Sequence, residues 1–217
     1  SWWPPYAIED RKRTGPLRRP ERPPAKGCGG MDQALVAQVR EGDQRAFEAL
    51  VTADHPRLYR VAFGVLRDRA AAEDATQQAL LDIWRDIRRL RDPARYEAWS
   101  YRLLVRVCYG EARRRPRWSS SEDLSPDDQG STTEAYDLVA DRDQLERGFR
   151  RLSVDHRVVL ALRHLLGMTP EQVAEVLGLP RSTVYSRLQA AVKAMRAALE
   201  ADERSVVRTL RRQEAVR

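Results

Sequence analysis

The chain has 217 residues, enough for two modest domains, and 33% of them are charged, with a formal net charge of +7. This positive balance predicts an acidic partner, either a nucleic acid or an anionic surface. Arginine supplies almost all of the excess, which suits phosphate and guanine contacts but is also typical of a GC-rich genome. No apolar run matches a membrane span or a signal peptide, so we expect a cytoplasmic protein without membrane insertion.

Side chains for metal or redox chemistry are sparse. The two cysteines, Cys28 and Cys108, lie far apart in unlike contexts, which indicates neither a disulfide framework nor a metal site. The three histidines are isolated from one another, and no phosphate-binding loop or nucleophile motif is present. We therefore expect no metal, no cofactor and no enzymatic activity.

Residues 1–30 hold six of the twelve prolines and show no helical or strand period, which predicts a disordered, basic tail. From Asp32 onward the apolar residues follow a 3.6-residue period. A first short helix should end near Gly42, and a second should kink or restart at Pro56. Asp68 is the expected cap of a third helix that runs to about residue 90.

The third helix has an apolar seam that includes Ile83 and Trp84. Its opposite face is predicted to be solvent-exposed and mostly acidic. A fourth helix follows Pro93, with Trp99 and Cys108 toward the core. Its outer side carries a basic stripe with one interleaved aromatic, which can bind phosphates and stack on an unpaired base; a solvated charged face is the alternative. The stripe and its continuation comprise Arg102, Arg106, Tyr109, Arg113 and Arg114.

Residues 117–138 are rich in Ser, Asp and Glu without an apolar period, as in a flexible acidic linker. A helix from about 139 to 152 and another capped by Asp155 should follow it. Together with two helices within 169–199 they make a second small all-α domain. The segment 200–217 alternates in charge and predicts a fraying helical tail.

The stretch from Thr169 to Leu199 predicts two helices joined by a tight turn. Thr169 and Gln172 have the spacing of a capping box, and Gly178 suits the left-handed end of the first helix. Ser182 is the expected cap of the second helix, whose apolar seam includes Val184, Leu188, Ala191, Val192, Met195 and Leu199.

Hydroxyl, amide and cationic groups project from the other side of this second helix, as a major-groove recognition helix requires. A plain helical hairpin with a solvated face is the alternative. The candidate DNA-binding residues are Arg181, Ser182, Thr183, Tyr185, Ser186, Arg187, Gln189 and Lys193.

Three stretches together resemble the bacterial sigma-70 family of RNA polymerase factors, of the extracytoplasmic-function (ECF) type. They are DRAAAEDATQQALLDIWRDI, EAWSYRLLVRVCYGEARRR and, after the polar linker, LSVDHRVVLALRHLLGMTPEQVAEVLGLPRSTVYSRLQAAVKAMR. The resemblance implies two small helical domains, sigma-2 over residues 32–116 and sigma-4 over residues 139–199. It implies that they direct core RNA polymerase to promoter DNA by reading the minus-10 and minus-35 elements.

The resemblance also assigns roles to the helices. The third helix would dock on the clamp helices of the largest polymerase subunit, sigma-4 would meet the flap region, and an anti-sigma factor is a possible further partner. The docking residues implied are Asp74, Gln77, Gln78, Leu81, Asp82, Trp84 and Arg85.

The fourth helix would read and open the minus-10 element, with Trp99 joining the basic stripe as a candidate. Val105 and Arg106 stand where the family usually has arginine and asparagine, and Gly110 stands where it has aspartate. Tyr185 replaces a lysine of the sigma-4 motif. The base preferences at both elements are therefore open.

Two alternatives stand beside the sigma-factor interpretation. One is a two-domain DNA-binding regulator that does not engage polymerase, and the other is an enzyme acting on nucleic acid, which the absence of a catalytic motif argues against. The acidic linker could mimic nucleic acid in the polymerase channel or serve as a passive tether.

Overall fold

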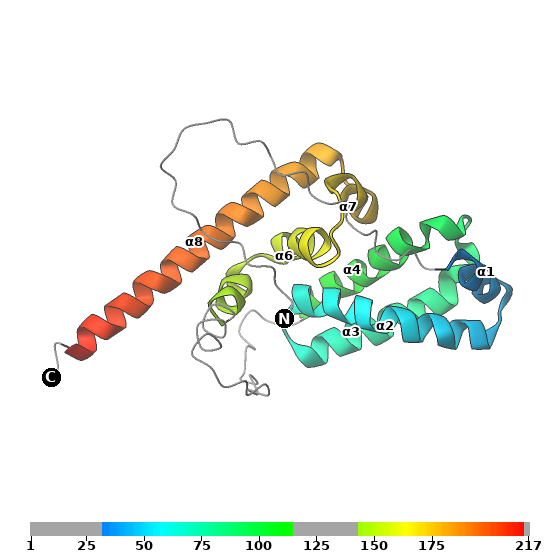
Figure 1. Ribbon diagram of the computed structural model, residues 1–217, viewed down its shortest axis with the longest axis horizontal. Helices are drawn as coiled ribbons and strands as arrows, with labels where there is room; N and C mark the ends of the chain where they lie inside the picture. The colour runs from blue at the N-terminus through cyan, green and yellow to red at the C-terminus, as the bar shows by residue number, and fades with distance from the viewer. Residues whose placement is uncertain (1–31, 115–142, 215–217) are drawn as a thin grey trace.

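The computed structural model describes residues 32–114 and 143–214, with the backbone alone for residues 203 and 205–214. Every regular element among these residues is a helix (Figure 1), which confirms the predicted all-α class. The predicted tail of residues 1–30 and the predicted linker of residues 117–138 lie outside the described residues.

The first two helices follow each other closely. α1 (Gln33–Glu41) starts after Asp32, whose carboxylate accepts a hydrogen bond of 2.9 Å from the Ala34 N–H. It ends as predicted at Gly42, whose φ of 99° lies in the left-handed region that glycine adopts without strain. α2 (Gln44–Leu66) then begins at once.

Pro56 lies inside α2, and no new helix begins there, so of the two expected outcomes, a kink or a restart, the restart is wrong. A proline in a helix interior removes one backbone hydrogen bond. That loss is offset because apolar residues on both sides of it, including Leu50, Leu58 and Val61, are buried. α2 therefore runs as one helix of 23 residues.

α3 (Arg69–Asp86) starts at the predicted cap, since the Asp68 carboxylate accepts a hydrogen bond of 2.7 Å from the backbone of its first turn. It ends earlier than predicted. Two short 3-10 helices and one long helix follow it: η1 (Ile87–Arg89), η2 (Pro93–Arg95) and α4 (Tyr96–Arg114). α3 packs between α2 and α4 and completes the first helical unit (Figure 1).

A buried polar network joins α2 to α4. The Tyr96 hydroxyl donates a hydrogen bond of 2.6 Å to Oδ2 of Asp54, which is only 4% exposed. Arg57 lies 3.8 Å from Asp54 and pairs with Glu97. Burial raises the pKa of the Asp54 carboxyl, while the Tyr96 hydrogen bond and the Arg57 charge oppose that rise. Each group in this network depends on its partners because none is well hydrated.

Replacing Tyr96 with phenylalanine is expected to lower the free energy of unfolding by about 2 kcal/mol, because it leaves a buried carboxylate without its hydrogen-bond donor. Tyr101→Phe is the matched control. The Tyr101 hydroxyl is buried and makes no direct hydrogen bond to a described residue, although the Arg57 guanidinium lies over its ring, so its loss should lower stability by less than about 1 kcal/mol. Urea unfolding of both variants measures the difference, and equal losses would contradict it.

The second helical unit opens with a helix over residues 143–151, followed by α6 (Val154–Leu160) and a π-helix, η3 (Ala161–Leu165). The cap of α6 is Ser153, whose hydroxyl accepts a hydrogen bond of 3.3 Å from the backbone of the first turn. The prediction that Asp155 caps this helix is therefore wrong. Asp155 lies inside the first turn of α6, and its carboxylate contacts α4 and α8.

α7 (Pro170–Leu177) has the predicted capping box. The Thr169 N–H donates to Gln172 Oε1 at 2.8 Å, and the Gln172 N–H donates to Thr169 Oγ1 at 3.3 Å. The helix ends at Gly178, whose φ of 64° is left-handed. The turn between the two helices of the predicted helix-turn-helix therefore forms as expected.

α8 (Arg181–Glu214) begins earlier than predicted, and the segment predicted as a helical tail continues it without a break. It begins one residue before Ser182, the expected cap, because the Pro180 carbonyl already accepts the Val184 N–H at 3.2 Å. At its other end it continues through most of the segment 200–217, predicted as a fraying tail. As far as Glu214, that segment is the end of one 34-residue helix.

A carboxylate explains why α8 continues past the predicted domain end. Asp202 is 6% exposed and lies 2.8 Å from Arg147 and 3.4 Å from Arg151. Arg151 also donates to the Ala198 carbonyl at 3.1 Å. These polar contacts join the helix over residues 143–151 to the part of α8 that follows its predicted apolar seam.

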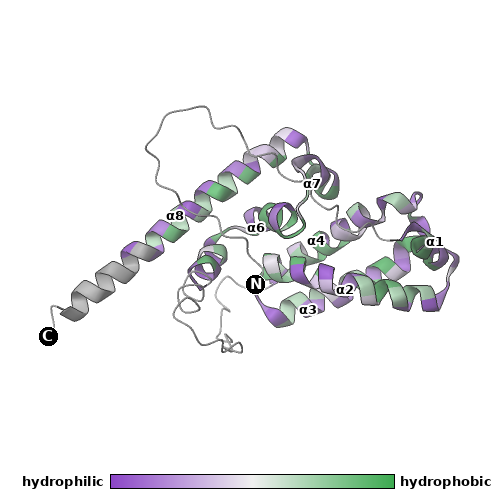
Figure 2. Cartoon of the chain, viewed as in Figure 1, coloured by the Kyte–Doolittle hydropathy of each residue, from purple (hydrophilic) through white to green (hydrophobic). Residues whose placement is uncertain are grey.

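The apolar side of α8 is narrower than predicted. Val184 and Ala191 are buried, whereas Val192 is 39% exposed, so its assignment to the seam is wrong. Ala198 is buried further along the helix. In the coloured part of α8 hydrophobic and hydrophilic residues are interspersed (Figure 2), as expected of a helix that packs on one side only.

The two helical units pack against each other and share one continuous apolar core. α2 contacts α6 and η3, and α4 contacts α7 (Figure 1). The approach is close at Gly64 of α2, where a Cβ atom would lie only 2.7 Å from Cδ1 of Leu165. A glycine at this position lets the second unit rest directly on α2.

Candidate nucleic-acid interface

Most of the predicted recognition residues lie on the outer side of α8 and are exposed to solvent. Tyr185 is 48% exposed, and its hydroxyl donates a hydrogen bond of 3.2 Å to Glu171 of α7. Thr183 and Arg187 are half-buried. The exposed members of the set, called here the α8 row, are Arg181, Ser182, Tyr185, Ser186, Gln189 and Lys193.

The α8 row borders a groove of about 390 Å³ between η3 and α8. Leu188 and Val192 supply its apolar surface, and the other lining residues are polar or cationic: Arg163, His164, Gln189, Lys193 and Arg196. Cationic and amide groups on a protruding helix beside a groove can contact phosphates and base edges.

α4 presents the predicted basic stripe, called here the α4 row. Arg102, Arg106 and Arg113 are exposed, and Tyr109 is half-buried. Arg114 is also exposed and pairs with Glu111 at 2.7 Å. Trp99, placed by sequence both toward the core and among the DNA candidates, is half-buried, and its ring centroid lies 6.1 Å from that of Tyr96.

The structure brings the α4 row against the second helical unit. Arg102 Nε donates to the Val176 carbonyl at 3.1 Å, and its Nη2 donates to the Glu175 carbonyl. These carbonyls lie in the last turn of α7, where the helix dipole is negative and carbonyls lack helical partners. A guanidinium suited to phosphate is therefore held by the end of a helix.

Asp155 contacts Tyr109 of the α4 row and Arg187, a half-buried member of the recognition set predicted on α8. Its Oδ1 accepts a hydrogen bond of 2.6 Å from the Tyr109 hydroxyl of α4 and one of 3.3 Å from Nη1 of Arg187 of α8. Burial and the hydrogen bond to Asp155 raise the pKa of the Tyr109 phenol. We call this set of contacts the Asp155 bridge.

The predicted docking residues occupy the outer side of α3 and form what we call the α3 face. Its apolar part consists of Leu81, 50% exposed, and Trp84, 39% exposed. Gln78 donates to Asp82 at 2.9 Å, and Arg85 lies 3.7 Å from the same carboxylate. The remaining members, Asp74 and Gln77, are exposed, and the face is thus apolar with an acidic and amide surround.

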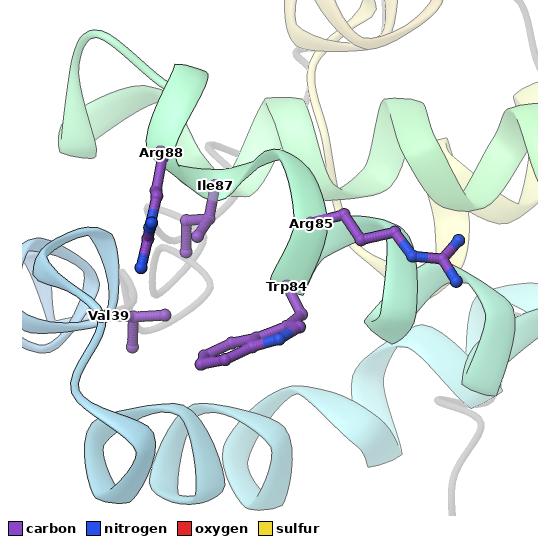
Figure 3. A pocket seen from close by; sticks show the side chains of 6 residues that line it. Val39, Trp84, Arg85, Ile87 and Arg88 are labelled. Atoms are coloured by element: carbon purple, nitrogen blue, oxygen red, sulfur yellow. The ribbon is translucent and has the colours of Figure 1, made fainter.

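Trp84 was predicted in the core seam, and its exposure corrects that prediction. Its ring lies 4.5 Å from the Phe47 ring of α2, so one side is packed and the other is in solvent. It lines a pocket of about 280 Å³ with Val39, Gly42 and Arg88. Figure 3 shows the Trp84 ring beside this pocket and the Arg85 guanidinium extending away from it.

Sequence reasoning missed the residues that join the two helical units. Arg67, at the end of α2, donates to Glu146 at 3.0 Å, and its guanidinium carbon lies 5.1 Å from the rings of both Phe63 and Phe149. Asp155 was noted only as a cap. Contacts between residues so far apart in sequence leave no periodic signal.

Two family profiles match the chain: Sigma-70 region 2 over residues 50–118 and Sigma-70 region 4 over residues 142–195. The chain is 33% identical to the ECF RNA polymerase sigma factor SigL of Mycobacterium tuberculosis, with 77% of this chain and 96% of that protein covered. It is 28% identical to the RNA polymerase sigma-H factor of Pseudomonas aeruginosa, with 78% and 94% covered.

Solved structures give the same result for the fold. CnrH in complex with the cytosolic domain of CnrY is similar at a TM-score of 0.58 and 26% identity, covering 79% of this chain and 98% of CnrH. The sigma factor RpoE in complex with the anti-sigma factor NepR, from Bartonella quintana, shares the fold at a TM-score of 0.58 and 22% identity, covering 73% and 99%.

The chain belongs to the sigma-70 family as an ECF RNA polymerase sigma factor. It binds core polymerase and directs promoter-specific initiation of transcription, and a regulator that does not engage polymerase is not favoured. Among the described residues, no helix is both long and apolar enough to cross a membrane.

Proposed function

We propose that this sigma factor divides its work among three surfaces: the α3 face docks on polymerase, the α4 row opens the minus-10 element, and the α8 row reads the minus-35 element. The observation that carries this division is the separation of charge. Both cationic rows present guanidinium or ammonium groups, whereas the α3 face combines carboxylates with exposed Leu81 and Trp84. Carboxylates repel DNA phosphates, so the α3 face suits a protein partner.

The α3 face has the composition of an interaction hot spot. A half-exposed tryptophan beside a half-exposed leucine offers apolar area that a partner helix can cover, and the flanking polar side chains fix its orientation. The clamp helices of the largest polymerase subunit are the proposed partner. The flap region is the proposed partner of the second helical unit.

Opening of DNA is the proposed role of the α4 row. Separated strands are stabilised when their backbone lies along cations and an unpaired base stacks on an aromatic ring. Arg106 and Arg113 are exposed along α4, and Tyr109 lies between them. The chain would recognise the promoter and hold the separated strands, while polymerase carries out RNA synthesis. We propose that it acts in the cytoplasm.

Lys193 and Gln189 test the role of the α8 row because both are exposed and neighbouring yet chemically different. Lys193→Ala is expected to weaken promoter binding by the holoenzyme for every sequence and to lower the salt slope by about 1, as the loss of one phosphate contact does. Gln189→Ala should instead change the preferred base at one position. Binding titrations over a salt series, with single-base promoter variants, measure both.

The two variants serve as controls for each other. A salt slope unchanged by Lys193→Ala would remove this lysine from the phosphate contacts. A uniform loss of affinity in Gln189→Ala, without a change in base preference, would remove that glutamine from direct readout.

An anti-sigma factor is a further proposed partner, because the similar structures of CnrH and RpoE are both complexes, the second with a protein named as an anti-sigma factor. Co-purification from a cell that expresses the tagged chain tests for such a partner.

A further inference from the structure

We propose that Glu171 makes Tyr185 a hydrogen-bond acceptor toward DNA, and that α8 thereby selects adenine or cytosine at one position of the minus-35 element. The inference rests on the proposed role of the α8 row and deepens it, because it names the bases that one member of the row reads. Tyr185 is 48% exposed, and its hydroxyl donates a hydrogen bond of 3.2 Å to Oε1 of Glu171 in α7.

The direction of this hydrogen bond follows from the charge of Glu171. Hydrogen bonds with its own backbone and with the Thr169 side chain lower the pKa of the Glu171 carboxyl, as does the nearby charge of Arg181. An ionised carboxylate can only accept hydrogen bonds, so the one proton of the Tyr185 hydroxyl points to Glu171. The phenol oxygen keeps its lone pairs, and it can accept a hydrogen bond from DNA but cannot donate one.

A group that only accepts hydrogen bonds distinguishes the bases in the major groove. Adenine and cytosine present an exocyclic amino group there, whereas guanine and thymine present acceptors, with which the phenol oxygen makes no hydrogen bond. Tyr185 is the fifth residue of α8, and the N-terminal part of a recognition helix meets base edges. The hydrogen bond to a carboxylate also polarises the phenol oxygen, which strengthens it as an acceptor.

The contact with Glu171 also fixes the position of the phenol oxygen. A tyrosine ring moves about two side-chain torsions, and a contact with a second helix limits both before DNA binds. Glu171 lies in the first turn of α7, which the capping box of Thr169 and Gln172 holds in place. Glu171 is thus the positioning residue, and Tyr185 is the residue that meets the base.

The chemistry of residue 185 sets the polarity of this contact. The lysine that Tyr185 replaces in the sigma-4 motif carries three donors and no acceptor, which suits guanine or thymine. A tyrosine bound to a carboxylate presents the opposite polarity. The exchange therefore predicts a change of preferred base and not merely a weaker contact.

Binding titrations with the holoenzyme test the inference. The probes are a promoter that the wild-type holoenzyme selects from random upstream sequences and all single-base variants of its minus-35 element. At one position the wild type should prefer adenine or cytosine over guanine and thymine about fivefold, as one hydrogen bond to a base edge allows. Tyr185→Phe should abolish this preference, and Tyr185→Lys should invert it in favour of guanine or thymine.

Glu171→Ala tests the positioning role. It frees the Tyr185 hydroxyl to donate or accept, so the preference should fall below about twofold, and in the Tyr185→Phe background Glu171→Ala should leave base preference unchanged. The matched control is Glu200→Ala, which removes an exposed acid from a later part of α8 and should keep the fivefold preference. The readout is the ratio of affinities for two bases, because loss of an acid strengthens binding to all sequences alike.

A preference that persists in Tyr185→Phe overturns the inference, because another group then reads the base. A preference that Glu171→Ala leaves intact, or that Glu200→Ala reduces equally, also overturns it. Failure of the proposed function is a separate result, in which the wild-type holoenzyme shows no base preference anywhere in the minus-35 region, and the inference falls with it. Failure of the inference alone leaves minus-35 preferences that substitutions of Tyr185 and Glu171 do not change.

Discussion

Replacing Leu81 and Trp84 together with alanine is expected to weaken binding of core RNA polymerase about a hundredfold, because exposed aromatic and aliphatic anchors dominate the affinity of protein interfaces. Both side chains present apolar surface that the rest of the chain leaves uncovered. Fluorescence anisotropy of the labelled sigma factor titrated with core polymerase measures the loss.

The matched control is Leu81→Met with Trp84→Phe, which keeps apolar area at both positions and should bind within about threefold of wild type. Because Trp84 also packs on Phe47, thermal unfolding must show that the alanine variant remains folded. Equal polymerase affinity of the folded alanine variant and the wild type would remove the α3 face from the docking surface.

The second large effect is expected on strand opening. Replacing Arg106 and Arg113 of the α4 row with alanine should reduce the fraction of open promoter complex about tenfold and lower the salt slope of its formation by about 2, since two phosphate contacts are lost. Permanganate reactivity of unpaired thymines on a promoter bound by holoenzyme measures the open fraction.

Arg69→Ala with Arg91→Ala is the control, because both arginines are exposed and lie outside α4, and the change in net charge is the same. This control should open promoters within about twofold of wild type, since screened charges far from the DNA contribute little. A loss as large as that of the α4 variant would mean that net charge, rather than the α4 row, drives opening.

Local sequence patterns predicted several helix ends correctly, although the cap expected at Asp155 and the restart expected at Pro56 were wrong. Asp68, the Thr169–Gln172 capping box and Gly178 all lie where short-range hydrogen bonding and backbone conformation require them. Such features depend on residues within one turn of each other, so the sequence contains all of the information needed.

Predictions that depended on distant packing were less successful. Periodicity placed Trp84 and Val192 in buried seams, yet each is 39% exposed. The angular position of a residue on a helix does not reveal how wide an arc the neighbouring helices cover. For Trp84, exposure beside Leu81 on a face whose other members are polar or charged is itself the signal of a partner.

The contacts between the two helical units could not be predicted at all. Tyr109 and Asp155 are separated by 46 residues, and Arg102 bonds to a carbonyl 74 residues away. A stripe of arginines on a helix predicts an acidic partner, but an internal carboxylate and a DNA phosphate satisfy that prediction equally well. Only the folded chain shows that Arg102 and Tyr109 of the α4 row, and Arg187 of α8, contact acceptors of the chain itself.

The most direct test of the central claim is run-off transcription by core polymerase with this chain on a library of random upstream sequences. The sigma-factor account predicts transcripts whose templates share two motifs at fixed spacing, one near minus-35 and one near minus-10. It also predicts that Gln189→Ala alters only the upstream motif. Absence of chain-dependent transcripts from every template, or transcripts without any shared upstream motif, would contradict the account.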